Sequence, residues 1–194
     1  MKIILINKRK LQVVFVAVIS MIILFAIGQI FEGHIKSVSF IQNNISSLQE
    51  YEALEGKLTY KLPSQWCVKS KTFPGGEIIY HNDFQSDDLV ITGFVQVWNI
   101  KDDLKDFLMK SKEVSEKQNI IKNYRISNIK INNREGYLVK YNMVANDVDY
   151  TAYEYFINNN NQFIRFSFFV KSQNFKESFA AIFYSIVKTT KIKG

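Results

Sequence analysis

An uninterrupted apolar run of 21 residues, Leu11 to Phe31, contains no charged side chain and directly follows three consecutive basic residues. An α-helix rises about 1.5 Å per residue, so about 20 apolar residues cross the hydrocarbon core of a bilayer. The run therefore predicts a transmembrane helix at residues 11–31. Basic residues without any acid precede it, which predicts a cytoplasmic tail at residues 1–10 and an extracytoplasmic location for the rest of the chain.

A cleaved signal peptide is the alternative interpretation of this run. Ala26-Ile27-Gly28 offers small residues at the spacing that signal peptidase favours, so cleavage after Gly28 stays open. The apolar residues continue to Phe31, which favours a retained signal anchor. Both interpretations export the remaining domain, and the predicted location is the cell membrane with a single pass.

Two segments follow the predicted membrane helix. Residues 32–56 form a predicted helical connector, because their apolar residues recur in steps of three and four. These residues are Val38, Ile41, Ile45 and Leu48. From residue 57 the pattern changes to short β-type runs, and residues 57–194 have the usual length of one domain with its own core.

The formal net charge is +7, and the basic residues of the domain are spread singly among acids. That distribution is typical of a solvated surface, so no nucleic-acid partner is expected. A mild basic excess is compatible with anionic lipid headgroups or wall polymers. The abundance of Lys, Asn and Ile indicates a bacterium with an AT-rich genome.

The order of the predicted elements defines the fold class. A helix is expected from Leu104, because the acidic pair Asp102-Asp103 precedes it and can cap its N-terminus. A closing helix is expected from Phe175, where Asn174 and Glu177 have the spacing of a capping box. Alternating apolar residues and turn signals predict strands at 58–62, 66–70, 77–80, 89–98, 124–131, 137–144, 150–157 and 163–170. Consecutive hairpins imply an antiparallel sheet with helices packed on it, which is an α+β architecture.

Several landmarks resemble the PsbP-like and DcrB-like proteins of the Mog/PsbP superfamily. They are Leu62-Pro63-Ser64-Gln65-Trp66, Gly76-Glu77-Ile78-Ile79-Tyr80, the segment NNREGYLVKY from Asn132 and the segment NFKESFAAIF from Asn174. The resemblance covers about residues 57–191. It implies an antiparallel sheet of six or seven strands flanked by helices, and a function that is accessory and not enzymatic. The predicted membrane helix and the lack of a transit peptide argue against a photosystem role.

The segment HNDFQSDD is the main candidate for chemistry. His81, Asp83, Asp87 and Asp88 are expected in a loop between two strands, where they are weak candidates for a metal site. Their spacing matches neither an EF-hand nor a zinc motif, so a solvated loop without a metal is favoured. The same acids define the alternative function, an exported hydrolase that acts on envelope polymers.

Tyrosines form a second candidate, a binding surface. Period two puts Tyr137 and Tyr141 on one face of their strand, and Tyr153 and Tyr155 on one face of the next. If the hairpin aligns the two faces, the four rings form a patch for a glycan or a partner. Burial beneath a helix is the favoured interpretation of the same pattern.

The chain is therefore expected to be a non-catalytic binding or accessory protein of the bacterial cell envelope. It has no phosphate-binding glycine loop, so no cofactor is predicted. Cys67 is the sole cysteine, and an intramolecular disulfide is excluded. The expected partners are the membrane and an unidentified envelope protein.

Overall fold

The computed structural model describes residues 47–99, 103–117 and 121–193. The predicted cytoplasmic tail, the predicted membrane helix at 11–31 and most of the predicted connector lie outside these residues. Among the residues described, no helix is long and apolar enough to cross a membrane.

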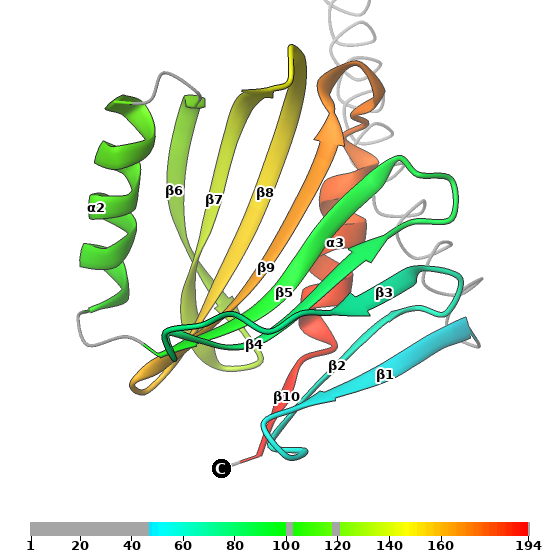
Figure 1. Cartoon of the computed structure of the whole chain (residues 1–194), viewed down its shortest axis with the longest axis vertical. Helices are drawn as coiled ribbons and strands as arrows, with labels where there is room; N and C mark the ends of the chain where they lie inside the picture. Colours follow the sequence, from blue (N-terminus) through cyan, green and yellow to red (C-terminus); the bar gives the residue numbers. More distant parts are fainter. Residues whose placement is uncertain (1–46, 100–102, 118–120, 194) are drawn as a thin grey trace, which may run out of the picture.

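A large antiparallel sheet of seven strands forms the centre of the domain (Figure 1). Its strands, in spatial order, are β3 (Cys67–Ser70), β4 (Ile78–Gln85), β5 (Ile91–Asn99), β9 (Gln162–Lys171), β8 (Val148–Asn159), β7 (Arg134–Ala145) and β6 (Ile121–Ile131). Four consecutive strands, β6 to β9, pair as hairpins, as the turn signals between them predict. The prediction of an antiparallel sheet of six or seven strands is confirmed.

A second, three-stranded antiparallel sheet was not expected. It consists of β1 (Leu48–Ala53), β2 (Leu58–Pro63) and β10 (Lys191–Ile192), in the order β1-β2-β10. The prediction of a helical connector is wrong from Leu48 onward. Tyr51 in β1 lies opposite Tyr60 in β2 and stacks on it with ring centroids 5.6 Å apart, so pairing with β2 overrides the helical spacing.

Helix α2 (Leu104–Lys117) begins as the sequence predicts. The carboxylate of Asp103 accepts a hydrogen bond of 2.7 Å from the backbone N–H of Lys105, which satisfies one unpaired amide of the first turn.

Helix α3 (Ser178–Lys188) begins later than predicted, after the short helix η2 (Ser172–Asn174). The capping-box prediction is wrong, because the N-cap residue Glu177 makes no side-chain capping bond. The backbone of Phe175 is extended, and its ring stacks on that of Tyr153 in the sheet with centroids 5.5 Å apart. Because of this contact, Phe175 is not part of the helix.

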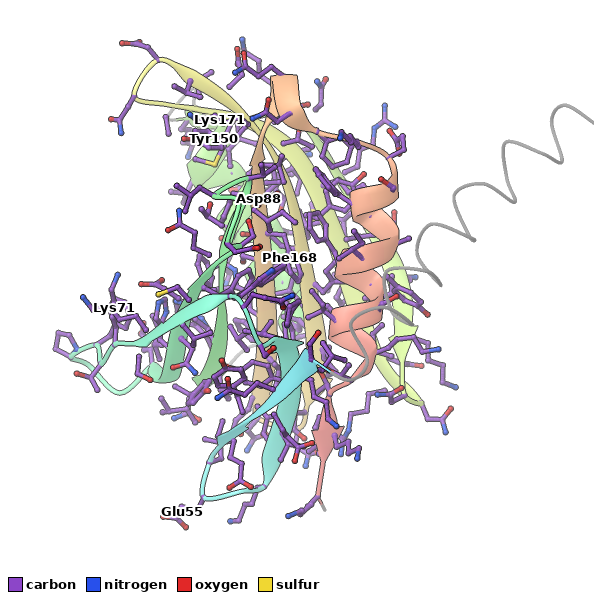
Figure 2. The ribbon with its side chains drawn as sticks, turned by 90° about the vertical axis from the view of Figure 1, so that its right-hand side faces the viewer. Glu55, Lys71, Asp88, Tyr150, Phe168 and Lys171 are labelled. Atoms are coloured by element: carbon purple, nitrogen blue, oxygen red, sulfur yellow. The ribbon has the colours of Figure 1, made fainter. Side chains whose placement is uncertain are left out.

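The large sheet is covered on both faces, and each face has its own apolar core. Helix α3 and the small sheet cover one face, while α2 covers the β6–β7 side of the other (Figures 1 and 2). In the first core, Phe183 of α3 is fully buried and stacks on Phe168 of β9 with ring centroids 4.3 Å apart. Strand β5 is apolar on both faces because it lies inside the sheet, as its sequence predicts.

Truncation of Phe183 tests how α3 is docked. We expect Phe183→Ala to lower the free energy of unfolding by ~3–5 kcal/mol, because it removes a fully buried ring and leaves a cavity. Lys176→Ala is the control, since Lys176 is exposed and should change stability by no more than about 0.5 kcal/mol. Denaturant melts of the fragment from residue 47 measure both values. Equal effects at the two positions would contradict the docking of α3.

Candidate functional site

The segment that was expected to be a loop with acidic residues is mostly a strand. β4 continues through Gln85 and pairs with β3 on one side and β5 on the other, so His81 and Asp83 lie in the sheet. Only Asp87 and Asp88 lie in the turn that follows, where both are exposed. The physical reason is that Asn82 and Phe84, which alternate with His81 and Asp83, are buried on the opposite face.

His81 is held by partners on both ring nitrogens. Its Nδ1 lies 2.8 Å from the amide nitrogen of Gln96, and its Nε2 lies 2.7 Å from Oδ1 of Asp83. Trp98 donates its indole N–H to Oε1 of Gln96 at 2.7 Å, and an indole nitrogen can only donate. The amide N–H of Gln96 therefore faces Nδ1, which must accept. His81 is thus a neutral ring with its proton on Nε2, donated to Asp83.

Asp83 is engaged on both carboxylate oxygens. Oδ1 accepts from His81, and Oδ2 lies 2.5 Å from the ammonium of Lys71. Burial acts to raise the pKa of Asp83, but the hydrogen bonds from Lys71 and His81 and the charge of Lys71 outweigh it, so the pKa lies below its ordinary value. Any stability that Asp83 contributes is therefore present above the ordinary carboxyl pKa and is lost as the pH falls through the lowered value.

The predicted metal candidates do not converge. Oδ1 of Asp88 accepts hydrogen bonds from the hydroxyl of Ser86 at 2.6 Å and from the backbone N–H of Val90 at 3.1 Å. Asp88 therefore stabilises its own turn. No group of three or more His, Cys, Asp or Glu side chains comes together within the part of the chain that the structure describes. The structure therefore does not bring His81, Asp83, Asp87 and Asp88 together as one group.

The tyrosines do not form one patch, because the register divides them between the two faces of the sheet. Tyr141 of β7 lies opposite Ala152, and Tyr153 of β8 lies opposite Lys140. The tyrosines of the two strands are therefore offset by one residue, and they point to opposite faces of the sheet. Tyr137 and Tyr141 therefore contribute to the core beneath α2, and Tyr153 and Tyr155 to the core beneath α3. The alternative prediction, burial beneath a helix, is confirmed for Tyr141, Tyr153 and Tyr155.

An ion pair between the buried Glu154 and the partly exposed Arg165 lies on the face that carries His81. Oε1 of Glu154 receives three donors: the guanidinium of Arg165 at 2.6 Å, the hydroxyl of Ser167 at 3.0 Å and the hydroxyl of Tyr141 at 3.1 Å. Arg165 also stacks its guanidinium over the rings of Phe94 and Phe156. Glu154 is only 4 % exposed, so these donors replace the water that it loses on folding.

The environment of Tyr141 follows from this pair. Burial raises the pKa of the Tyr141 hydroxyl, and the neighbouring charge of Glu154 raises it further. Tyr141 therefore acts as a hydrogen-bond donor to Glu154 and not as an acid.

Sequence reasoning missed Glu154, Arg165 and Gln96 as a group. The available signal was a polar side chain inside each of three apolar strands, namely Gln96 in β5, Glu154 in β8 and Arg165 in β9. Adjacent pairing brings these strands together, and the sequence alone did not specify the partners.

Two hollows open beside these elements. A groove of about 490 Å³ lies over β3, β4, β5 and β9, with Phe94 and Phe169 in its lining and Lys71 and Asp83 beside them. Cys67 also lines the groove, and it is exposed, whereas a free cysteine is more often buried.

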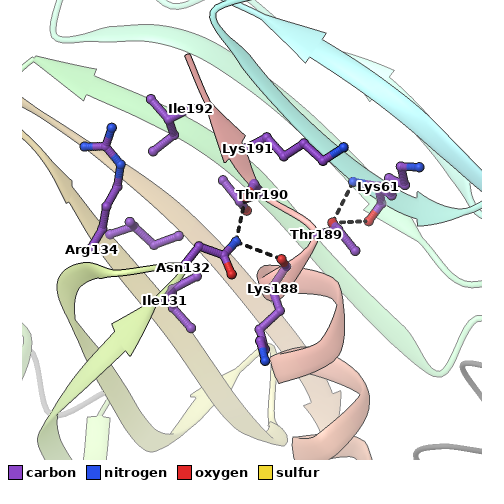
Figure 3. A pocket seen from close by; sticks show the side chains of 10 residues that line it. Lys61, Ile131, Asn132, Arg134, Lys188, Thr189, Thr190, Lys191 and Ile192 are labelled. Carbon is purple, nitrogen blue, oxygen red and sulfur yellow. Dashed lines mark hydrogen bonds between the residues drawn. The ribbon is translucent and has the colours of Figure 1, made fainter. Parts of the chain in front are cut away.

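The second hollow, which we call the cationic pocket, has a volume of about 600 Å³ (Figure 3). Four separate segments line it: β2, the β6–β7 hairpin, β8 and the link from α3 to β10. Its lining residues include Lys61, Arg134, Lys188 and Lys191, together with Thr190 and three isoleucines.

Comparison with solved structures shows that the domain has a PsbP-like fold. The solution structure of cyanobacterial PsbP (CyanoP) from Synechocystis sp. PCC 6803 matches with a TM-score of 0.58 and 14% identity over 75% of this chain and 92% of that chain. A crystal structure from Bacteroides thetaiotaomicron VPI-5482 matches with a TM-score of 0.53 and 14% identity, over 76% of this chain and 49% of that chain. At these identities the similarity establishes the fold alone.

A weaker likeness links the chain to LpqN, which is involved in cell envelope biogenesis of Mycobacterium tuberculosis. Its TM-score is 0.47 at 12% identity, over 81% of this chain and 96% of that chain. No family model matches the sequence, and no curated protein does.

The hydrogen-bonding of His81 yields a direct test by NMR. In the fragment from residue 47, His81 is the only histidine, and we expect its ring nitrogens to show a single neutral tautomer protonated at Nε2 at neutral pH. Trp98→Phe removes the indole donor, so the Gln96 amide is free to turn and the tautomer should no longer be unique. A ring protonated at Nδ1 in the unchanged fragment would contradict the assignment.

Proposed function

We propose that this chain is a membrane-anchored, extracytoplasmic binding or accessory protein of the bacterial cell envelope, and that it does not catalyse a reaction. The apolar run at 11–31 and its basic flank support the anchor and the orientation. The PsbP-like fold supports an accessory role, since the sequence resemblance to that group implies one.

One observation carries the non-catalytic part of the proposal. A general base needs a nitrogen or oxygen that can reach a substrate proton. Both ring nitrogens of His81 and both oxygens of Asp83 are already engaged by other side chains of the domain. Asp88 stabilises its own turn, so His81, Asp83 and Asp88 of the alternative hydrolase serve structural contacts.

The buried pair of Glu154 and Arg165 fits the same interpretation. Oε1 of Glu154 is held by three donors, and the Arg165 guanidinium lies against two aromatic rings. Such a network fixes side chains in one arrangement, and it leaves Tyr141 as a donor within the protein. We infer that this network shapes the sheet face and takes no part in a reaction.

Protease accessibility tests the orientation. We expect protease added to intact protoplasts to remove the domain and to leave the first residues of the chain protected, because the basic flank retains the N-terminus in the cytoplasm. Immunoblots against tags at the two ends measure both fragments. Protection of the domain would reverse the topology, and a membrane-bound product that begins at Gln29 would establish cleavage after Gly28.

The hydrolase alternative is tested by replacing its acids together. We expect the purified chain and the variant Asp83→Asn, Asp87→Asn, Asp88→Asn to release equal, background amounts of soluble product from envelope polymers, because none of these acids has a catalytic arrangement. Product release by the unchanged chain and its loss in a variant that still melts cooperatively would favour the hydrolase.

A further inference from the structure

Four side chains on one face of the large sheet form a chain of hydrogen bonds that all run in one direction. The indole N–H of Trp98 donates to Oε1 of Gln96 at 2.7 Å, and the Gln96 amide N–H donates to Nδ1 of His81 at 2.8 Å. Nε2 of His81 donates in turn to Asp83 at 2.7 Å. The direction is fixed at both ends, because an indole can only donate and a carboxylate can only accept.

A second proton on His81 conflicts with this chain. An imidazolium ring donates from both nitrogens, so Nδ1 then presents an N–H to the amide nitrogen of Gln96. His81 and Trp98 lie against different atoms of that amide, its nitrogen and its oxygen. The single amide oxygen cannot accept from both donors in these positions. One of the two hydrogen bonds of Gln96 must therefore break when His81 becomes charged.

The bond to Trp98 is the one that breaks. A hydrogen bond donated by an imidazolium is charge-assisted and about twice as strong as a bond between neutral groups. The Gln96 amide therefore turns its oxygen to His81 and its NH₂ group to the indole. Two donors then face each other at the indole, and Trp98 loses its partner.

Charged groups face the histidine ring from the elements around it. Asp83 of β4 favours the charged ring, whereas Lys71, which follows β3, and Arg165 of β9 oppose it. Lys69 of β3 lies opposite Asp83, and Glu154 of β8 is already paired with Arg165. The Asp83 carboxylate, which contacts Nε2 directly, is thus the group that holds the charged ring in place.

Trp98 connects the histidine to helix α2. Its ring stacks on Phe163 with centroids 5.8 Å apart and lies 5.8 Å from the ring of Phe107 in α2. Phe107 also packs on Phe163 at 5.1 Å, and its backbone N–H closes the first turn of α2 on the carbonyl of Asp103 at 3.0 Å. Figure 1 shows that α2 is the next helix after β5, the strand that carries Trp98. A shift of the indole therefore moves the contact that docks the first turn of α2.

We propose that His81, Gln96 and Trp98 form a pH-sensitive switch that controls the docking of α2. With a neutral ring the chain of bonds is complete, and Phe107 holds the first turn of α2 on the sheet. When the pH falls and the ring takes its second proton, the amide turns, the indole is released and this turn loosens. The switch goes beyond the proposed accessory function and does not depend on the membrane topology. On an extracytoplasmic domain it responds to the pH of the medium.

NMR of the full chain in an uncharged detergent, with ¹⁵N in its tryptophans, tests the switch. The chain has two tryptophans, so the two indole N–H signals belong to Trp98 and Trp66. We expect the Trp98 signal to move between about pH 8 and pH 5, the range in which histidines charge, with the same midpoint as the ring C–H signals of His81. Trp66 is the internal control, because it lies in the core beneath α3 and stacks on Phe84. His34→Gln removes the other histidine, so the remaining histidine signals belong to His81.

Two variants separate the switch from a general effect of pH on the fold. Gln96→Met removes the amide and keeps an unbranched side chain, so His81 should still charge while the Trp98 signal no longer follows it. His81→Gln cannot charge, so its Trp98 signal should stay constant over the same range.

Hydrogen exchange at the Phe107 amide measures the docking of α2. We expect its protection factor in the unchanged chain to fall about tenfold or more between pH 7 and pH 5, since one hydrogen bond is lost. In Gln96→Met the protection factor should be the same at both pH values, because the amide that couples the two rings is absent.

Three outcomes would overturn the switch. They are a Trp98 signal that stays constant while His81 charges, a His81 ring that stays neutral down to pH 5, and a Trp98 signal that still follows the pH in His81→Gln. None of these outcomes affects the proposed accessory role. Protection of the domain in protoplasts would overturn the proposed location and leave the switch intact.

Discussion

The pairing register of β8 between β7 and β9 is the constraint on which the rest of the structure depends. Side chains alternate along each strand, so a slip of one residue would move every side chain of β8 to the other face. In the observed register Tyr153 and Tyr155 face α3, while Glu154 faces the opposite side beside Ser167. One register therefore decides both the aromatic core beneath α3 and the ion pair of the other face.

The ion pair in turn explains how a charged residue is tolerated inside a seven-stranded sheet. Burying Glu154 alone would be costly, and burying it with one partner is at best a small gain. Three donors from the two neighbouring strands, β7 and β9, meet one oxygen of Glu154, and two aromatic rings cover Arg165. The network stabilises only this register, because a slipped strand would bury the carboxylate against the apolar core.

A different constraint shapes the far end of the domain. Asn132 joins the β6–β7 hairpin to the end of α3, and Thr189 joins that end to β2 by accepting the backbone N–H of Lys61 at 2.8 Å. These contacts connect residues more than 50 positions apart in the chain and leave the cationic pocket between the two sheets. Its cations come from separate segments of the chain, and only the tertiary structure brings them to one pocket.

The sequence by itself determined the local structure: the strands from β2 to β9, helix α2, the apolar face of α3 and the expected PsbP-like architecture. Alternation and helical spacing are local properties, so they can be read from neighbouring residues. Tertiary structure decided that Leu48–Ala53 is a strand, that the tyrosines divide between two faces, that His81 lies in the sheet and that Thr190 and Arg134 line one pocket. Each of these depends on pairing or packing between distant segments, where a long-range contact such as that between Tyr51 and Tyr60 outweighs local preference.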